Sequence, residues 1–118
     1  MEKATFGLDE NIASAACYLL GWITGIIFFV VEKDNKTVRF HAMQSILTFL
    51  PLMIIIWIVS AVLFAMFMFS GLYGIAWMIV TLIEIIMLLL WLFLMYKAYK
   101  GEKFLVPIVG AIAESQVK

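Results

Sequence analysis

The chain has 118 residues and no formal net charge, because eight basic side chains balance eight acidic ones. Hydrophobic residues make up 66% of it, charged residues only 14%, and the mean hydropathy is +1.13. A water-soluble domain this short has too much surface to hide such a composition, and the balanced charge excludes the basic surface that nucleic-acid binding needs. We therefore predict an all-α integral membrane protein that lies in the lipid bilayer and binds no nucleic acid.

Three apolar segments predict three transmembrane helices. Residues 12–31 are 20 residues without a charge, enough to cross a hydrocarbon core of about 30 Å at about 1.5 Å per residue. Residues 40–83 also lack a charge, and the two glycines of residues 70–74 predict a turn that divides them into spans at about 46–69 and 75–96.

The remaining residues complete a single predicted domain, residues 1–118. Residues 101–118 are too short and too interrupted to cross, so we expect a short interfacial C-terminal segment. A fourth span would split one of the apolar segments and place the two basic clusters on opposite faces. The predicted fold is thus a membrane bundle of three transmembrane helices with an interfacial tail.

Two clusters of basic residues predict the orientation. They follow the first and third spans and consist of Lys33, Lys36 and Arg39, and of Lys97, Lys100 and Lys103. The positive-inside rule places both on the cytoplasmic side. We therefore expect a multi-pass protein of the cell membrane with its N-terminus outside and its C-terminus in the cytoplasm, and we assign the second cluster to anionic lipid headgroups.

A narrow stripe of small and polar residues follows one face of the first predicted span. Its members recur at steps of three and four and are Asn11, Ser14, Tyr18, Gly21 and Gly25. The two glycines form a GxxxG pattern, which lets a second helix approach closely. This face is predicted to pack against protein, either within the chain or between two copies.

A second polar stripe enters the membrane at the start of the second apolar segment. It follows Arg39 and comprises His41, Gln44, Ser45 and Thr48, at the spacing of one helical face. Such a stripe needs hydrogen-bond partners in lipid. We favour a packing role, with partners at Asn11, Ser14 or the loop; the alternative is a polar vestibule for a substrate or a proton, with His41 titrating.

Glu84 is the only acidic residue inside a predicted span, where a charge costs about 3 kcal/mol. Two explanations stay open: a protonated, hydrogen-bonded side chain, or a carboxylate that faces a wet interior beside Thr81. No Ser/His/Asp set, phosphate-binding glycine loop or metal-spaced His/Cys cluster accompanies it, and Cys17 is the single cysteine. We therefore expect no enzyme activity, no cofactor and no metal.

Several stretches resemble a small prokaryotic membrane family of unknown function. They are residues 11–21 with Gly25, residues 32–36, the Arg-Phe-His-Ala-Met-Gln-Ser stretch at 39–45, residues 97–101 and residues 107–110. That family is similar to the membrane subunit of the chloroplast inner-envelope (Tic) protein-import translocon, which has four spans. The resemblance implies a helical membrane protein that forms an oligomer or joins a larger complex, with no catalytic residue.

Two hypotheses for function follow. The first is a non-enzymatic membrane module for assembly or translocation, with the bilayer and either a homo-oligomer or a membrane complex as its partners. The alternative is a small oligomeric channel or transporter with a polar path lined by His41, Gln44, Ser45 and Glu84.

Overall fold

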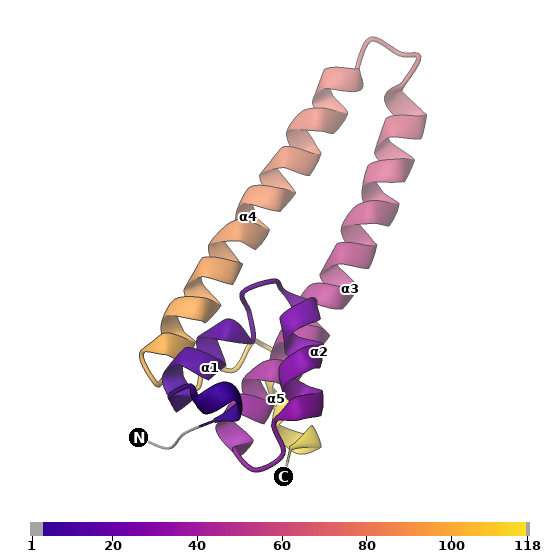
Figure 1. The fold of residues 1–118 in the computed structure, drawn as a ribbon. Helices are drawn as coiled ribbons and strands as arrows, with labels where there is room; N and C mark the ends of the chain where they lie inside the picture. The colour runs from indigo at the N-terminus through magenta and orange to yellow at the C-terminus, as the bar shows by residue number, and fades with distance from the viewer. Residues whose placement is uncertain (1–3, 118) are drawn as a thin grey trace.

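The structure, a computed structural model, describes residues 4–117, and its regular elements there are helices joined by short turns (Figure 1). A short 3-10 turn, η1, precedes the α-helices. The elements in chain order are η1 (Thr5–Gly7), α1 (Glu10–Ala16), α2 (Trp22–Val31), α3 (Lys36–Phe67), α4 (Tyr73–Tyr99) and α5 (Val109–Gln116). The two ends of the predicted domain, residues 1–3 and residue 118, lie outside the described part.

The long helices α3 and α4 form an antiparallel hairpin (Figure 1). They have 32 and 27 residues, so at about 1.5 Å per residue each is longer than a hydrocarbon core of about 30 Å. Apolar side chains stay exposed along most of both helices, as expected where lipid is the solvent. Within residues 4–117 these two are the helices able to span a membrane, so the prediction of three spans was wrong.

The predicted first span, residues 12–31, is instead broken into α1 and α2. Residues 17–21, which we call the tip, join the two short helices. Gly21 takes a φ of 63° at this break, a left-handed conformation that glycine adopts without steric cost. The 10 residues of α2 cover only about 15 Å, half of a hydrocarbon core.

The pair α1–α2 packs against the base of the long hairpin, with α1 against α4 and α2 against α3. Gly21 lies beside Phe49, and the Trp22 indole donates to Met53 Sδ at 3.4 Å. The tip thus reaches about 20–25 Å along α3 from its first residue. Because the outer side of α2 exposes Ile23, Ile27 and other apolar side chains, we infer that α1–α2 enters the bilayer and turns back.

The two chain ends therefore lie at the same end of the molecule, beside α1, α2 and α5 and opposite the α3–α4 turn (Figure 1). With two spans, the chain ends on the side of the membrane where it began. The predicted placement of the termini on opposite sides required a third span, so it does not follow from this fold.

The C-terminal segment folds back onto α3 through α5. Gly110 allows this fold, because a Cβ atom there would lie 2.5 Å from the Leu105 side chain. Gly110 and Ala113 are buried, whereas Ile108 and Ile112 stay exposed. The segment predicted as an interfacial tail thus contains a helix that docks on the base of the bundle.

The two-span topology predicts which sites share a side of the membrane. Single cysteines at Glu10→Cys and Ser115→Cys should react with an impermeant maleimide from one side, and Gly71→Cys in the α3–α4 turn from the other. Native Cys17 is fully buried, so it should contribute no labelling. Labelling of position 10 together with position 71, and not with 115, would show that the first apolar segment crosses.

Candidate functional site

The tip is held by a polar cluster in which five side chains from three parts of the chain meet. These side chains are Tyr18 of the tip, His41, Gln44 and Ser45 of α3, and Trp91 of α4. Tyr18, Gln44 and Ser45 are completely buried, and His41 is 2% exposed. We call this group the tip cluster.

The partners of Gln44 identify its amide oxygen and nitrogen, and so fix the direction of its three hydrogen bonds. The Val106 N–H can only donate, so it identifies Gln44 Oε1 at 3.0 Å, and the Phe104 carbonyl can only accept, so it identifies Nε2 at 2.9 Å. Gln44 Nε2 then donates its second hydrogen to the Tyr18 hydroxyl at 2.9 Å. That hydroxyl keeps its own hydrogen and lies 2.8 Å from His41 Nδ1, so it can donate to a neutral imidazole whose hydrogen is on Nε2.

The cluster also satisfies the backbone of the tip, where helix hydrogen bonds are interrupted. Ser45 Oγ donates to the Gly21 carbonyl at 2.7 Å, and the Trp91 indole N–H donates to the Tyr18 carbonyl. The Thr24 hydroxyl accepts from Leu20 N–H at 3.1 Å and donates to the Cys17 carbonyl at 3.1 Å. An irregular backbone within a membrane persists only when protein groups pair with it in this way.

The predicted glycine face packs within the chain. A Cβ atom on Gly25 would lie 2.9 Å from the Ala42 carbonyl oxygen and 3.1 Å from the Ser45 and Ile46 side chains. The closeness of α2 and α3 at this point is what allows Ser45 to reach the tip. Gly21 supplies the turn and Gly25 the close approach.

The other predicted packing residues lie around the cluster rather than in it. The Asn11 amide donates to the Tyr99 carbonyl at 3.0 Å, near the end of α4. The Arg39 guanidinium stacks on Phe29 at 4.1 Å and donates to the Phe29 and Glu32 carbonyls, which end α2. The hydroxyls of Ser14 and Thr48 are buried without a hydrogen bond in the described structure.

The three lysines that follow the third predicted span make local contacts. Lys97 binds Glu102 at 2.6 Å and, with this hydrogen bond, lowers the pKa of that carboxyl from its usual value. Lys103 pairs with Glu114 at 3.1 Å, and Lys100 lies over the Tyr96 ring at 5.8 Å. Two of the three are therefore already paired with a carboxylate.

Glu84 lies apart from all of these groups. It is exposed on α4, and it makes no hydrogen bond or ion pair with any described residue. His41, Gln44 and Ser45 are enclosed in the tip cluster, so the structure does not join them to Glu84 in one path. Across residues 4–117, no group of three or more His, Cys, Asp or Glu side chains is arranged to hold a metal ion.

Sequence reasoning missed Trp91 of the tip cluster and Thr24, whose hydroxyl pairs with the backbone of the tip. The Trp91 indole finds its hydrogen-bond partner because the broken tip presents the Tyr18 carbonyl. The signal available in the sequence was Gly21, since glycine is among the residues favoured at the N-cap of a helix.

Sequence comparison relates this chain to known membrane proteins. Residues 9–113 match the sequence profile of the magnetosome magnetite crystal formation protein family, MamF/MmsF. A UPF0132 membrane protein of Methanocaldococcus jannaschii is 48% identical over 114 residues, which cover 97% of this chain and 94% of that protein. A UPF0132 membrane protein of Archaeoglobus fulgidus is 39% identical, covering 93% of this chain and 97% of that protein. No solved structure matches the chain.

The geometry of Gln44 predicts a large loss of stability when its amide is removed. Gln44→Leu leaves the Val106 N–H, the Phe104 carbonyl and the Tyr18 hydroxyl without their partner, and each buried unpaired group costs about 1–3 kcal/mol. We expect a clear fall in the thermal unfolding midpoint in detergent. Gln116→Leu, at the other glutamine of the chain, should leave it nearly unchanged; equal midpoints for both variants would contradict the role of Gln44.

A matched pair of glycine substitutions tests the packing of α2 on α3. Gly25→Ala should destabilise the fold by about 1–3 kcal/mol because the added methyl group meets the α3 backbone. Gly74→Ala adds the same group where no atom lies within 4 Å, so it should be neutral or slightly stabilising. Thermal unfolding of both variants in one detergent makes the comparison, and a stable Gly25→Ala protein would refute the close contact.

Proposed function

We propose that this chain, which belongs to the magnetosome magnetite crystal formation protein family, is a non-enzymatic membrane module that assembles with further copies of itself. Its function would be structural: to form a defined oligomer in the bilayer through the exposed face of α4 around Glu84. The observation behind this proposal is a carboxyl group in the middle of a membrane-spanning helix that has no partner among residues 4–117.

The position of Glu84 makes an isolated carboxylate costly. It lies about 16 Å from the first residue of α4 and about 22 Å from the last, beyond the reach of its short side chain to either membrane surface. A charged residue at the centre of a spanning helix costs about 3 kcal/mol. A protein partner that supplies hydrogen bonds removes much of this cost.

A second copy offers suitable groups on the same surface. Thr81 lies one turn before Glu84 and is also exposed, flanked by the exposed apolar side chains Trp77 and Leu88. In a two-fold symmetric pair the same patch meets itself, so Glu84 and Thr81 of one copy face those of the other. Two facing carboxyl groups can share one proton, and the threonine hydroxyl can donate to them.

The glycines of the first apolar segment do not serve this association, since Gly21 and Gly25 are used inside the chain. A translocation-related role is a narrower form of the proposal, and its support is the residue resemblance to the Tic subunit alone. The family's description names magnetite crystal formation; self-assembly in the bilayer is compatible with that setting and does not depend on it.

The oligomeric channel receives less support than the assembly module. A polar path would need His41, Gln44 and Ser45 to face water. In the structure their hydrogen-bonding groups are occupied by Tyr18, Gly21 and the backbone of residues 104–106. Glu84 would then have to line such a path without them.

Native mass spectrometry in nanodiscs tests the assembly. The wild type should give a defined oligomer, and Glu84→Leu should shift it toward monomer by removing the group that requires a partner. Glu84→Gln keeps the hydrogen-bonding capacity and should retain more of the oligomer. Ile86→Ala, on the opposite side of α4, is the control and should assemble as the wild type does. A monomeric wild type, or an oligomer that persists in Glu84→Leu, would refute the proposed interface.

A further inference from the structure

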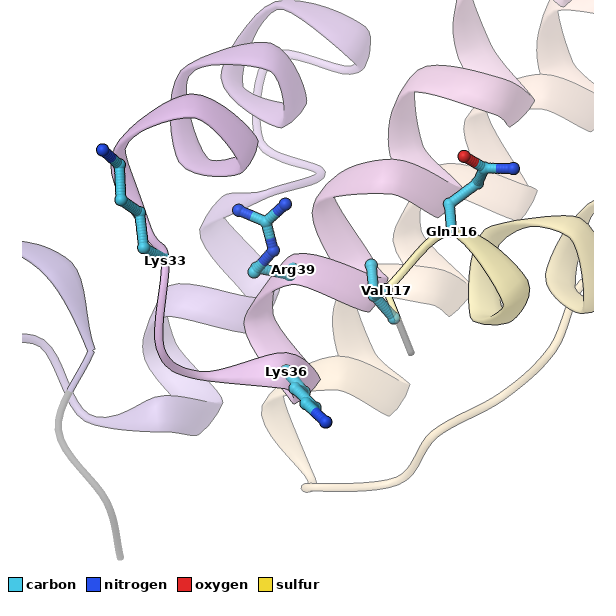
Figure 2. A pocket seen from close by; sticks show the side chains of 5 residues that line it. All are labelled: Lys33, Lys36, Arg39, Gln116 and Val117. Carbon is cyan, nitrogen blue, oxygen red and sulfur yellow. The ribbon is translucent and has the colours of Figure 1, made fainter.

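An open pocket lies where the N-terminus of α3 meets the end of α5, away from the tip cluster and from Glu84. It has a volume of about 440 Å³ and is lined by Lys33, Lys36, Arg39, Gln116 and Val117 (Figure 2). This volume falls within the range of about 300–1,000 Å³ that is common for small-molecule sites. The pocket therefore has room for a ligand group of appreciable size.

The charge of the pocket favours an anion. Three of its five lining side chains are cationic and none is acidic. Lys33 and Lys36 make no hydrogen bond or ion pair with any described residue. Figure 2 shows Arg39 between Lys33 and Gln116, with Lys33 and Lys36 on the segment that leads into α3.

Two of the nearby acidic groups, Glu32 and Glu114, already have partners. Glu32 accepts the backbone N–H groups of Asp34 and Asn35 at 3.2 and 3.4 Å, and Glu114 is paired with Lys103. Asp34 lies between the two lysines in the sequence but does not line the pocket. The side chains that line this pocket therefore carry an excess of positive charge. Lys97 and Lys103, by contrast, are each paired with a carboxylate.

The pocket is also at the depth where lipid headgroups would lie. Lys36 is the first residue of the spanning helix α3, and the chain ends and the last turn of α4 lie at the same end of the molecule (Figure 1). A smaller pocket of about 250 Å³ shares Lys36 and Val117 with the first and is also lined by Thr37 and by the paired Lys103 and Glu114. The hydroxyl of Thr37 and the amide of Gln116 offer neutral hydrogen bonds beside the charges.

We propose that this pocket binds the phosphate group of an anionic lipid headgroup. Lys33 and Lys36 supply point charges, and Arg39 contributes its positive charge while its Nη1 holds the end of α2. A free phosphate has the same binding chemistry, but the position of the pocket beside the spanning helices favours the lipid. The binding would fix the base of the bundle to one leaflet.

Lipid retention in native mass spectrometry tests the site. Wild-type protein from nanodiscs of phosphatidylcholine with phosphatidylglycerol should retain phosphatidylglycerol. The double variant Lys33→Gln/Lys36→Gln should bind it about 30-fold more weakly, since each lysine near an anionic surface contributes a factor of about five. Lys97→Gln/Lys100→Gln removes the same charge from the same end and should retain it. An unchanged unfolding midpoint in both variants shows that each has folded.

Inorganic phosphate distinguishes the two sources of the ligand. At constant ionic strength, added phosphate should not displace phosphatidylglycerol from the wild type. Displacement that is lost in Lys33→Gln/Lys36→Gln would overturn the lipid assignment in favour of a free phosphate. Equal retention by both double variants, or equal loss from both, would refute a specific pocket and leave only a general basic surface.

Discussion

A helix that ends inside a bilayer must find partners for its backbone groups, and the base of this molecule is organised around that requirement. The break at residues 17–21 leaves the carbonyls of Tyr18 and Gly21 unpaired within the helix, and the Trp91 indole and the Ser45 hydroxyl donate hydrogen bonds to them. Each donor comes from a different spanning helix. The tip therefore ties α3 to α4 at the end where they would otherwise be held by apolar contacts alone.

The same cluster connects the two ends of the chain. Gln44 binds the Tyr18 hydroxyl on one side and the backbone of Phe104 and Val106 on the other, so the N-terminal hairpin and the C-terminal segment meet on one side chain. Because buried polar networks are costly when only partly satisfied, this arrangement favours a single packing of α1, α2 and α5. The other half of the α3–α4 hairpin lacks such ties and offers its apolar surface, with Glu84, to lipid or to another protein.

The polar residues that the sequence singled out thus fall into two groups, those with hydrogen-bond partners inside the fold and those without. Their local sequence does not tell the two groups apart. His41, Gln44 and Ser45 look like the lining of a path, but all three are buried in protein and make hydrogen bonds there. Glu84, Lys33 and Lys36 have no partner in the described structure. We assign function to Glu84, Lys33 and Lys36, because a ligand or another copy of the chain can bind side chains that the fold leaves unpaired.

Much of the architecture followed from composition and helical period. The absence of charge over residues 40–83, the glycines at 71 and 74 and the spacing of His41, Gln44 and Ser45 predicted a helical hairpin with a polar face near its start. The break of residues 12–31 into two short helices could not be predicted in this way, because hydropathy measures whether a segment is stable in lipid and not whether it crosses the membrane. Whether this segment crosses the membrane or turns back depended on the tertiary structure. Ser45 and Trp91 lie 24 and 73 residues away from the carbonyls to which they donate. No local sequence pattern shows that such distant side chains will pair with a broken backbone.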